Sequence, residues 1–262
     1  MHINAATAWT AAILTVTVVG GFSSQWAPGA GSAVAPVAAA AAAAATPAGT
    51  VGAAASTTAA AAVAAVKPAV VSVAFTTEAE LRARMKWIPV KYGGERVKTL
   101  DEESRLLLAQ AAAERAGLDK VGLSYEDVYG LINAETSWIP RTGMGKNGVA
   151  SMGLAQFEPR TAKGLGLKDP NDPVQAVYFA AINMKHGAQW ASDRIAHLQL
   201  PPEQYASKMR EGVSIYYNLS VKGRNKWDGT NTAALPIETQ RHIRNVRTGA
   251  EKAADLAEEI WS

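Results

Sequence analysis

The chain has 262 residues, no cysteine, a formal net charge of +3 and a sequence pI near 9.0. This length accommodates one globular domain with additional segments. The absence of cysteine excludes disulfides, thiolate metal sites and an acylated N-terminal cysteine. The small positive excess fits an anionic polymer and an ordinary solubilising surface equally well, so it selects no class of partner.

The N-terminal part of the chain differs in composition from the rest. Residues 1–77 contain a single charged side chain, Lys67, whereas the other 25 basic and all 23 acidic residues follow. Residues 1–26 include the apolar run "AWTAAILTVTVVGGF", which predicts an export signal, with an uncleaved membrane anchor or a non-exported segment as alternatives. Residues 27–66 are almost all small residues that leave nothing to bury, and they predict a flexible tether rich in Ala, Pro and Gly.

Residues 67–98 form a connector whose structure the sequence defines poorly. "AVVSVAF" is compatible with a short strand, "TEAELRARMKW" with one amphipathic helix, and "VKYGGERVK" with a turn-containing link.

Residues 99–262 contain a series of residues that typically begin helices, which indicates a helical domain. Each expected helix follows a capping residue or a proline, at Thr99, Ser124, Pro159, Asp172–Pro173, Pro201–Pro202 and Pro236. The last one predicts either one long helix or two helices joined near Gly249. No alternating strand pattern follows residue 99, so we predict an all-α domain.

One carboxylate, Glu135, stands out on the second of these helices. Val128, Leu131, Ile132 and Glu135 occur at i, i+3, i+4 and i+7, which places the acid on the apolar stripe that faces the interior. A carboxyl group buried among apolar groups stays protonated more readily and can donate a proton to a leaving group. The alternative is a helix-end carboxylate that turns into solvent or pairs with Arg141 or Lys146.

Four ordered segments carry a family resemblance. They are "ETS" at 135–137, "GLAQFEPRTA" at 153–162, "YYNLS" at 216–220 and "PIETQRHIRNV" at 236–246. Together they resemble the lytic transglycosylases with a goose-type-lysozyme-like (SLT) catalytic domain, and the resemblance covers residues 99–262. It implies a lysozyme-like helical fold.

The chain departs from this family pattern at several positions. Thr136 is inserted before Ser137, Ala155 stands for a methionine and Glu158 for an apolar residue. Tyr216 and Ser220 replace an alanine and a glycine, and His242 occupies the position of a tyrosine. These departures affect the expected shape of the sugar subsites more than the expected class of enzyme.

The resemblance implies cleavage of the β-1,4 bond between N-acetylmuramic acid and N-acetylglucosamine in peptidoglycan. Glu135 would act first as acid and then as base, which closes a 1,6-anhydro ring on the muramic residue. The implied substrate-binding residues are Ser137, Gly153, Gln156, Tyr217 and Asn218, with Glu238 and Thr239 in support. Structural alternatives exist for three of them: a turn-stabilising amide for Gln156, a core aromatic for Tyr217 and a helix-dipole partner for Glu238.

Two other functions stay open at this point. A lysozyme-type muramidase would need a second carboxylate, and the sequence offers no clear one. Glu158 lies near the active segment, although it also fits a helix N-cap. A peptidoglycan-binding structural component without catalysis is the alternative from another class. Trp138, Tyr178 and Trp190 are candidates for stacking on sugars, with core packing as the alternative.

Partners and cofactors follow from the same residues. His186, His197 and His242 lack metal-ligand spacing, and no phosphate loop or basic-aromatic pattern occurs, so we expect no metal, no cofactor and no nucleic acid. The expected setting is the periplasm or cell envelope, with a secretion, conjugation or phage-entry assembly as partner, or alternatively a virion.

Overall fold

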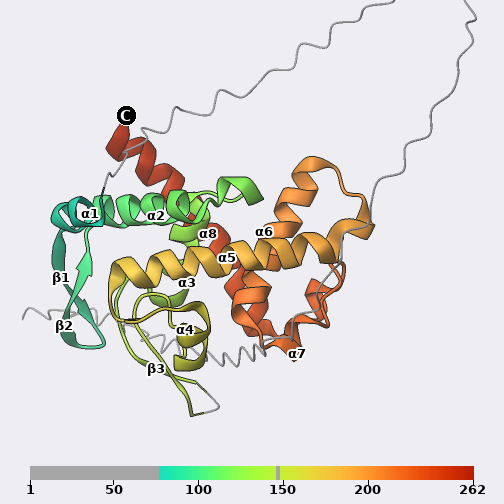
Figure 1. Cartoon of the computed structure of the whole chain (residues 1–262), viewed down its shortest axis with the longest axis horizontal. Coiled ribbons are helices and arrows are strands. Elements are labelled where there is room, and N and C mark those ends of the chain that lie inside the picture. Colours follow the sequence, from blue (N-terminus) through green and yellow to red (C-terminus); the bar gives the residue numbers. More distant parts are fainter. Residues whose placement is uncertain (1–76, 146–147) are drawn as a thin grey trace, which may run out of the picture. The chain divides into compact units, whose positions relative to one another are not determined.

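The computed structural model describes residues 77–145 and 148–262. The signal or anchor at 1–26, the tether at 27–66 and the strand in "AVVSVAF" lie outside the described residues. The described part is mainly helical, which confirms the all-α class (Figure 1). Its α-helices are α1 Glu78–Arg84, α2 Glu102–Ala116, α3 Tyr125–Thr136, α4 Pro159–Leu165, α5 Pro173–Ile195, α6 Pro202–Asn218, α7 Val221–Arg224 and α8 Ile237–Trp261. Within these residues, no helix combines the length and the apolar character needed to cross a membrane.

Most helix starts lie where the sequence predicts them. Ser124 and Asp127 form a capping box at α3, and the Asp172 side chain accepts a hydrogen bond from Gln175 N at the start of α5. A proline occupies the first turn of α4, α5 and α6, where its missing N–H costs nothing.

The helix start expected at Thr99 is wrong. The N-cap of α2 is Asp101, whose carboxylate accepts a hydrogen bond of 2.9 Å from Ser104 N. Thr99 is instead buried in a strand, and its hydroxyl donates to the Trp138 carbonyl at 2.6 Å. Thr99 and Asp101 are both residue types that cap helices. Because Thr99 pairs with Ile88 in a strand, Asp101 is the residue that caps α2.

The connector before residue 99 contains a hairpin. Strand β1, Trp87–Tyr92, pairs antiparallel with β2, Glu95–Leu100, around a turn in which Gly93 and Gly94 both have positive φ. A boundary at residue 99 would therefore fall inside β2. After residue 99 the helical domain also contains one short strand pair, in which β3, Gly143–Met144, pairs with β4, Ala150–Ser151. Strands of two residues are too short to show alternation in sequence.

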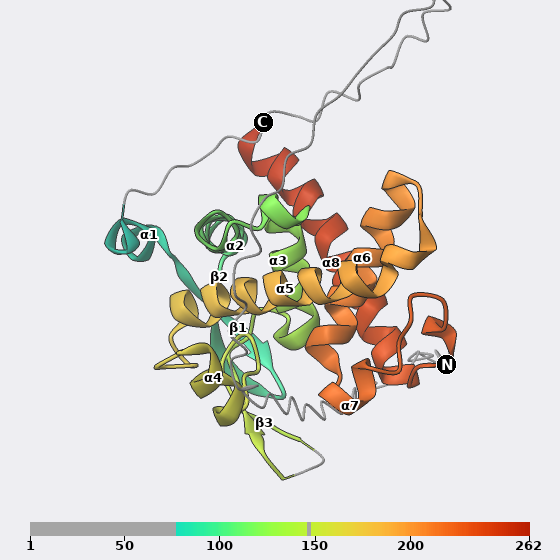
Figure 2. The same ribbon diagram turned by 45° about the vertical axis from the view of Figure 1, so that its right-hand side comes forward.

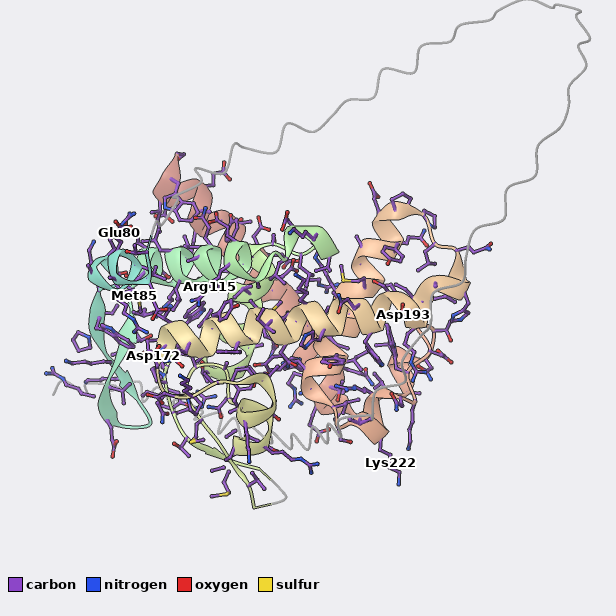
Figure 3. All side chains as sticks on the ribbon, in the orientation of Figure 1. Glu80, Met85, Arg115, Asp172, Asp193 and Lys222 are labelled. Atoms are coloured by element: carbon purple, nitrogen blue, oxygen red, sulfur yellow. The ribbon has the colours of Figure 1, made fainter. Side chains whose placement is uncertain are left out.

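Helix α1 packs on the same core as the later helices. Its Leu81 is buried, and Arg82 forms an ion pair of 2.8 Å with Asp172 at the start of α5. Glu78 forms a second ion pair, of 3.3 Å, with Arg115 on α2. Figure 3 labels Arg115 on α2 and Asp172 at the start of α5, the two residues with which α1 forms these ion pairs. The segment from residue 77 is thus part of the helical unit.

Helices α3 and α8 cross at two glycines. A Cβ on Gly130 would lie 2.3 Å from the Val246 carbonyl oxygen, and one on Gly249 would lie 2.8 Å from Gly130 Cα. Helix α8 is continuous through Gly249, so this glycine marks a close helix contact instead of a break between two helices. Figure 2 shows both helices behind α5. Backbones that approach this closely bring side chains from both helices within hydrogen-bonding range.

The close helix crossing predicts that a methyl group added at Gly130 destabilises the fold. We expect Gly130→Ala to lower the free energy of unfolding by about 1–3 kcal/mol, because the clash with the α8 backbone exceeds the gain in helix propensity. Urea unfolding followed by circular dichroism measures the change. Gly223→Ala is the matched control, since its Cβ would lie 3.4 Å from its nearest neighbour. An equally stable Gly130→Ala protein would contradict the close crossing.

Candidate active site

Glu135 lies buried in the last turn of α3. Its stripe partners Val128, Leu131 and Ile132 are fully buried, and Glu135 itself is 5% exposed. Its Oε1 lies 2.9 Å from Nε2 of His242 on α8, a ring that is 8% exposed. The predicted inward orientation of the acid is confirmed, and the solvent-facing alternative is wrong.

Arg141 contacts the backbone of Glu135 instead of its carboxylate. Its guanidinium donates to the carbonyl oxygens of Glu135 at 2.7 Å and Thr136 at 3.1 Å. These are among the last carbonyls of α3, which have no partner within the helix and carry partial negative charge. The same guanidinium donates to the Tyr92 hydroxyl at 3.0 Å, so the β1–β2 hairpin helps to hold this helix end. Lys146 lies outside the described residues.

The chain turns sharply after α3. Ser137 and Trp138 both have left-handed backbones, with φ of 53° and 64°. Ser137 is the exposed C-cap residue, whereas Trp138 is fully buried with its ring 5.1 Å from that of Tyr129. Trp138 is therefore a core residue, and substrate contact by Ser137 stays a prediction.

Thr136 joins α3 to the segment that contains Gln156. Its buried hydroxyl donates to the Leu154 carbonyl at 2.9 Å. In that segment Gly153 has φ of 74°, and a Cβ there would lie 1.9 Å from the Pro170 carbonyl oxygen. Only glycine fits such a position, so Gly153 has a backbone role whether or not it contacts a substrate.

The amide of Gln156 organises the surrounding loop. Its Nε2 donates to the carbonyls of Arg141 and Gly153, each at 2.9 Å, and its Oε1 accepts from Ser151 Oγ at 2.9 Å. Both amide protons are thus used within the protein. The turn-stabilising role is confirmed, and contact with a sugar acetamido group stays a prediction.

The third and fourth sequence segments meet beside Glu135. The Tyr217 hydroxyl donates to the Ala155 carbonyl at 2.9 Å, and Thr239 Oγ1 donates to Asn218 Oδ1 at 2.8 Å. Burial raises the pKa of Tyr217 well above its usual value, and the neighbouring Glu135 charge raises it further. The phenol therefore stays protonated at neutral pH. Glu238 is exposed in the first turn of α8, as expected for a helix-dipole partner.

A pocket of about 370 Å³ adjoins these residues, between α4, α5, α6 and α7. Gln156, Tyr217 and Glu158 line it, together with the buried guanidinium of Arg224, which lies 3.7 Å from the Tyr216 ring centroid. Burial lowers the pKa of Arg224. The pocket thus combines aromatic surface, amides and charge, a combination that suits a polar ligand with apolar faces, such as a sugar.

Two further aromatics proposed for stacking are engaged elsewhere. The Trp190 ring lies 5.6 Å from those of Tyr216 and Trp227, and Tyr178 lies under the guanidinium of Arg115 at 4.1 Å. Neither Trp190 nor Tyr178 lines the pocket. Their contacts favour the packing interpretation.

His242 is the site residue that sequence analysis did not assign. The only sequence signal was its position at a tyrosine of the family pattern, and its contact with Glu135 joins residues 107 positions apart. In the described ranges, no group of three His, Asp or Glu side chains has the arrangement of a metal site.

Comparison with known proteins gives one partial similarity. Over 54 residues the chain is 44% identical to a protein named transglycosylase from Enterobacteria phage PRD1. The chain is related to a phage transglycosylase over this stretch. The aligned residues are 21% of this chain and 19% of the phage protein, so they span less than a fifth of that relative's length. No family model and no solved structure matches.

The link between α3 and the Gln156 segment is open to test. We expect Thr136→Val to destabilise the fold by about 1–3 kcal/mol, because the buried Leu154 carbonyl loses the Thr136 donor. Denaturant unfolding measures the loss, with exposed Thr142→Val as control. Equal stability of both variants would contradict a structural role for the Thr136 hydroxyl.

Proposed function

We propose that this chain is a peptidoglycan lytic transglycosylase in which Glu135 is the catalytic acid and base. The observation that carries the proposal is a buried carboxylate, 5% exposed, with one oxygen held by His242. The similarity to a phage transglycosylase supports the same class. The pocket lined by Gln156 and Tyr217 provides room for a sugar, although Glu135 itself is not among its lining residues.

The proposed first step is proton donation. In this step Glu135 donates a proton from Oε2, the oxygen that is not held by His242 Nε2. It transfers this proton to the glycosidic oxygen, and the bond between that oxygen and C1 of the muramic residue breaks. N-acetylglucosamine leaves with a free 4-hydroxyl, and positive charge develops at C1.

The proposed second step closes the ring. The carboxylate of Glu135 takes the proton of the muramic 6-hydroxyl, and O6 forms a bond to C1. Glu135 is protonated again, and the product ends in a 1,6-anhydro ring without uptake of water. One residue serves both steps, so no second carboxylate is required, in contrast to two-carboxylate glycosidases.

The proposal also includes the substrate, the partner assembly and the location of the protein. The substrate is the glycan strand of peptidoglycan, and the phage origin of the relative favours an assembly for phage entry over secretion or conjugation machinery. The corresponding locations are the virion and the cell envelope.

The decisive experiment is mass spectrometry of the soluble products that the intact chain releases from purified peptidoglycan. We expect muropeptides with anhydro ends, one water lighter than hydrated ends. Glu135→Gln keeps the shape but removes the titratable proton, so we expect a loss of activity of about 10²- to 10⁴-fold. Exposed Glu251→Gln is the matched control and should retain activity.

Other products would overturn the proposal in distinct ways. Hydrated reducing ends alone would identify a muramidase. Binding to peptidoglycan with no cleavage by a folded protein would identify a structural component.

A further inference from the structure

The contact between Glu135 and His242 has properties that a helix-packing contact does not require. Oε1 and Nε2 are 2.9 Å apart, both side chains are at least nine-tenths buried, and α3 and α8 each contribute one partner. At this separation a proton lies between the two atoms, on the nitrogen or on the oxygen. The protonation of either residue is therefore tied to that of the other.

The other ring nitrogen of His242 has no hydrogen-bond partner among residues 77–145 and 148–262. Nδ1 is buried and makes no hydrogen bond within the described residues. In the part of the chain that the structure describes, Glu135 Oε1 is thus the one group that fixes the ring through a hydrogen bond. A neutral ring with its proton on Nε2 donates to Oε1 and leaves the second oxygen, Oε2, for a ligand.

The charges around the pair come from each element that packs against it. Arg141 binds the backbone carbonyl of Glu135, and the protonated phenol of Tyr217 on α6 lies within the field of Glu135. On α8 itself, the ionisable side chains within four positions of His242 are exposed and screened by water, namely Glu238, Arg241 and Arg244. His242 is therefore the titratable group that contacts the carboxylate directly.

We propose that His242 is a positioning residue that orients the Glu135 carboxyl group and controls its strength as a base in ring closure. This inference rests on the proposed function. With a neutral ring, Glu135 can hold a proton on Oε2 for the first step and act as an effective base afterwards. With a doubly protonated ring, the positive charge stabilises the carboxylate and makes it a weaker base for ring closure. Activity should then fall on the acid side of the optimum as His242 becomes charged.

The test compares pH profiles of anhydro-muropeptide release by the intact chain. The wild type should give a bell-shaped profile with an acid limb between about pH 5 and 8, the range in which histidine changes charge. His242→Gln and His242→Tyr can still donate to Oε1 but do not titrate in this range. Both variants should retain more activity than His242→Phe and lose the acid limb. His242→Phe, which cannot donate, should lose about 10- to 100-fold at every pH.

Exposed His197→Gln is the matched control and should keep the wild-type profile. An unchanged acid limb in His242→Gln and His242→Tyr would overturn the role of His242. If the wild type releases no anhydro products at all, the proposed function fails instead, and the two failures are distinguishable.

A second measurement does not depend on activity. Nitrogen-15 NMR of histidine-labelled resting protein reports the tautomer and titration of His242, assigned by its absence in His242→Gln. We expect Glu135→Gln to change the His242 titration and to leave that of His197 unchanged. Identical His242 titrations with Glu and Gln at position 135 would overturn the coupling, and circular dichroism shows whether each variant is folded.

Discussion

The close crossing of α3 and α8 is the constraint on which the site depends. At Gly130 and Gly249 no side chain separates the two backbones, and the helices can approach closely. Glu135 follows Gly130 on α3, whereas His242 precedes Gly249 on α8, so antiparallel helices bring the two side chains together. The hydrogen bond of 2.9 Å between them is the product of this geometry. A buried carboxylate would be costly without it, because a buried charge requires a partner.

The surrounding contacts keep the end of α3 in place. The guanidinium of Arg141 binds the terminal carbonyls of the helix, and the Thr136 hydroxyl ties the helix to the Leu154 carbonyl. The Gln156 amide then fixes the loop that follows. Gln156 resembles a substrate-binding position of the family, and its side chain both shapes the loop and lines the pocket. The departure at Thr136 is explained by its contact with Leu154.

Glu135, the acid that the resemblance to lytic transglycosylases implies, is buried, and the ring that contacts it is His242, at the position where the family pattern has a tyrosine. A tyrosine at position 242 would donate one hydrogen bond and stay neutral over the physiological range, whereas a histidine adds a second site for a proton. The nearby phenol of Tyr217 donates to Ala155 and is kept protonated by burial. The protein thus places one titratable ring directly against its buried acid.

The sequence by itself determined the helical class, most helix starts and the inward orientation of Glu135. These features depend on helix caps, prolines and the 3.6-residue period of apolar residues, all of which are set by residues close together in the sequence. Only the tertiary structure decided the partner of Glu135, the continuity of α8 through Gly249 and the strand role of Thr99. Each of these depends on contacts between distant segments, such as Glu135 with His242 and Thr99 with Trp138, where local preference is outweighed by packing and by the need to pair buried polar groups. No local pattern encodes which two helices will meet at their glycines.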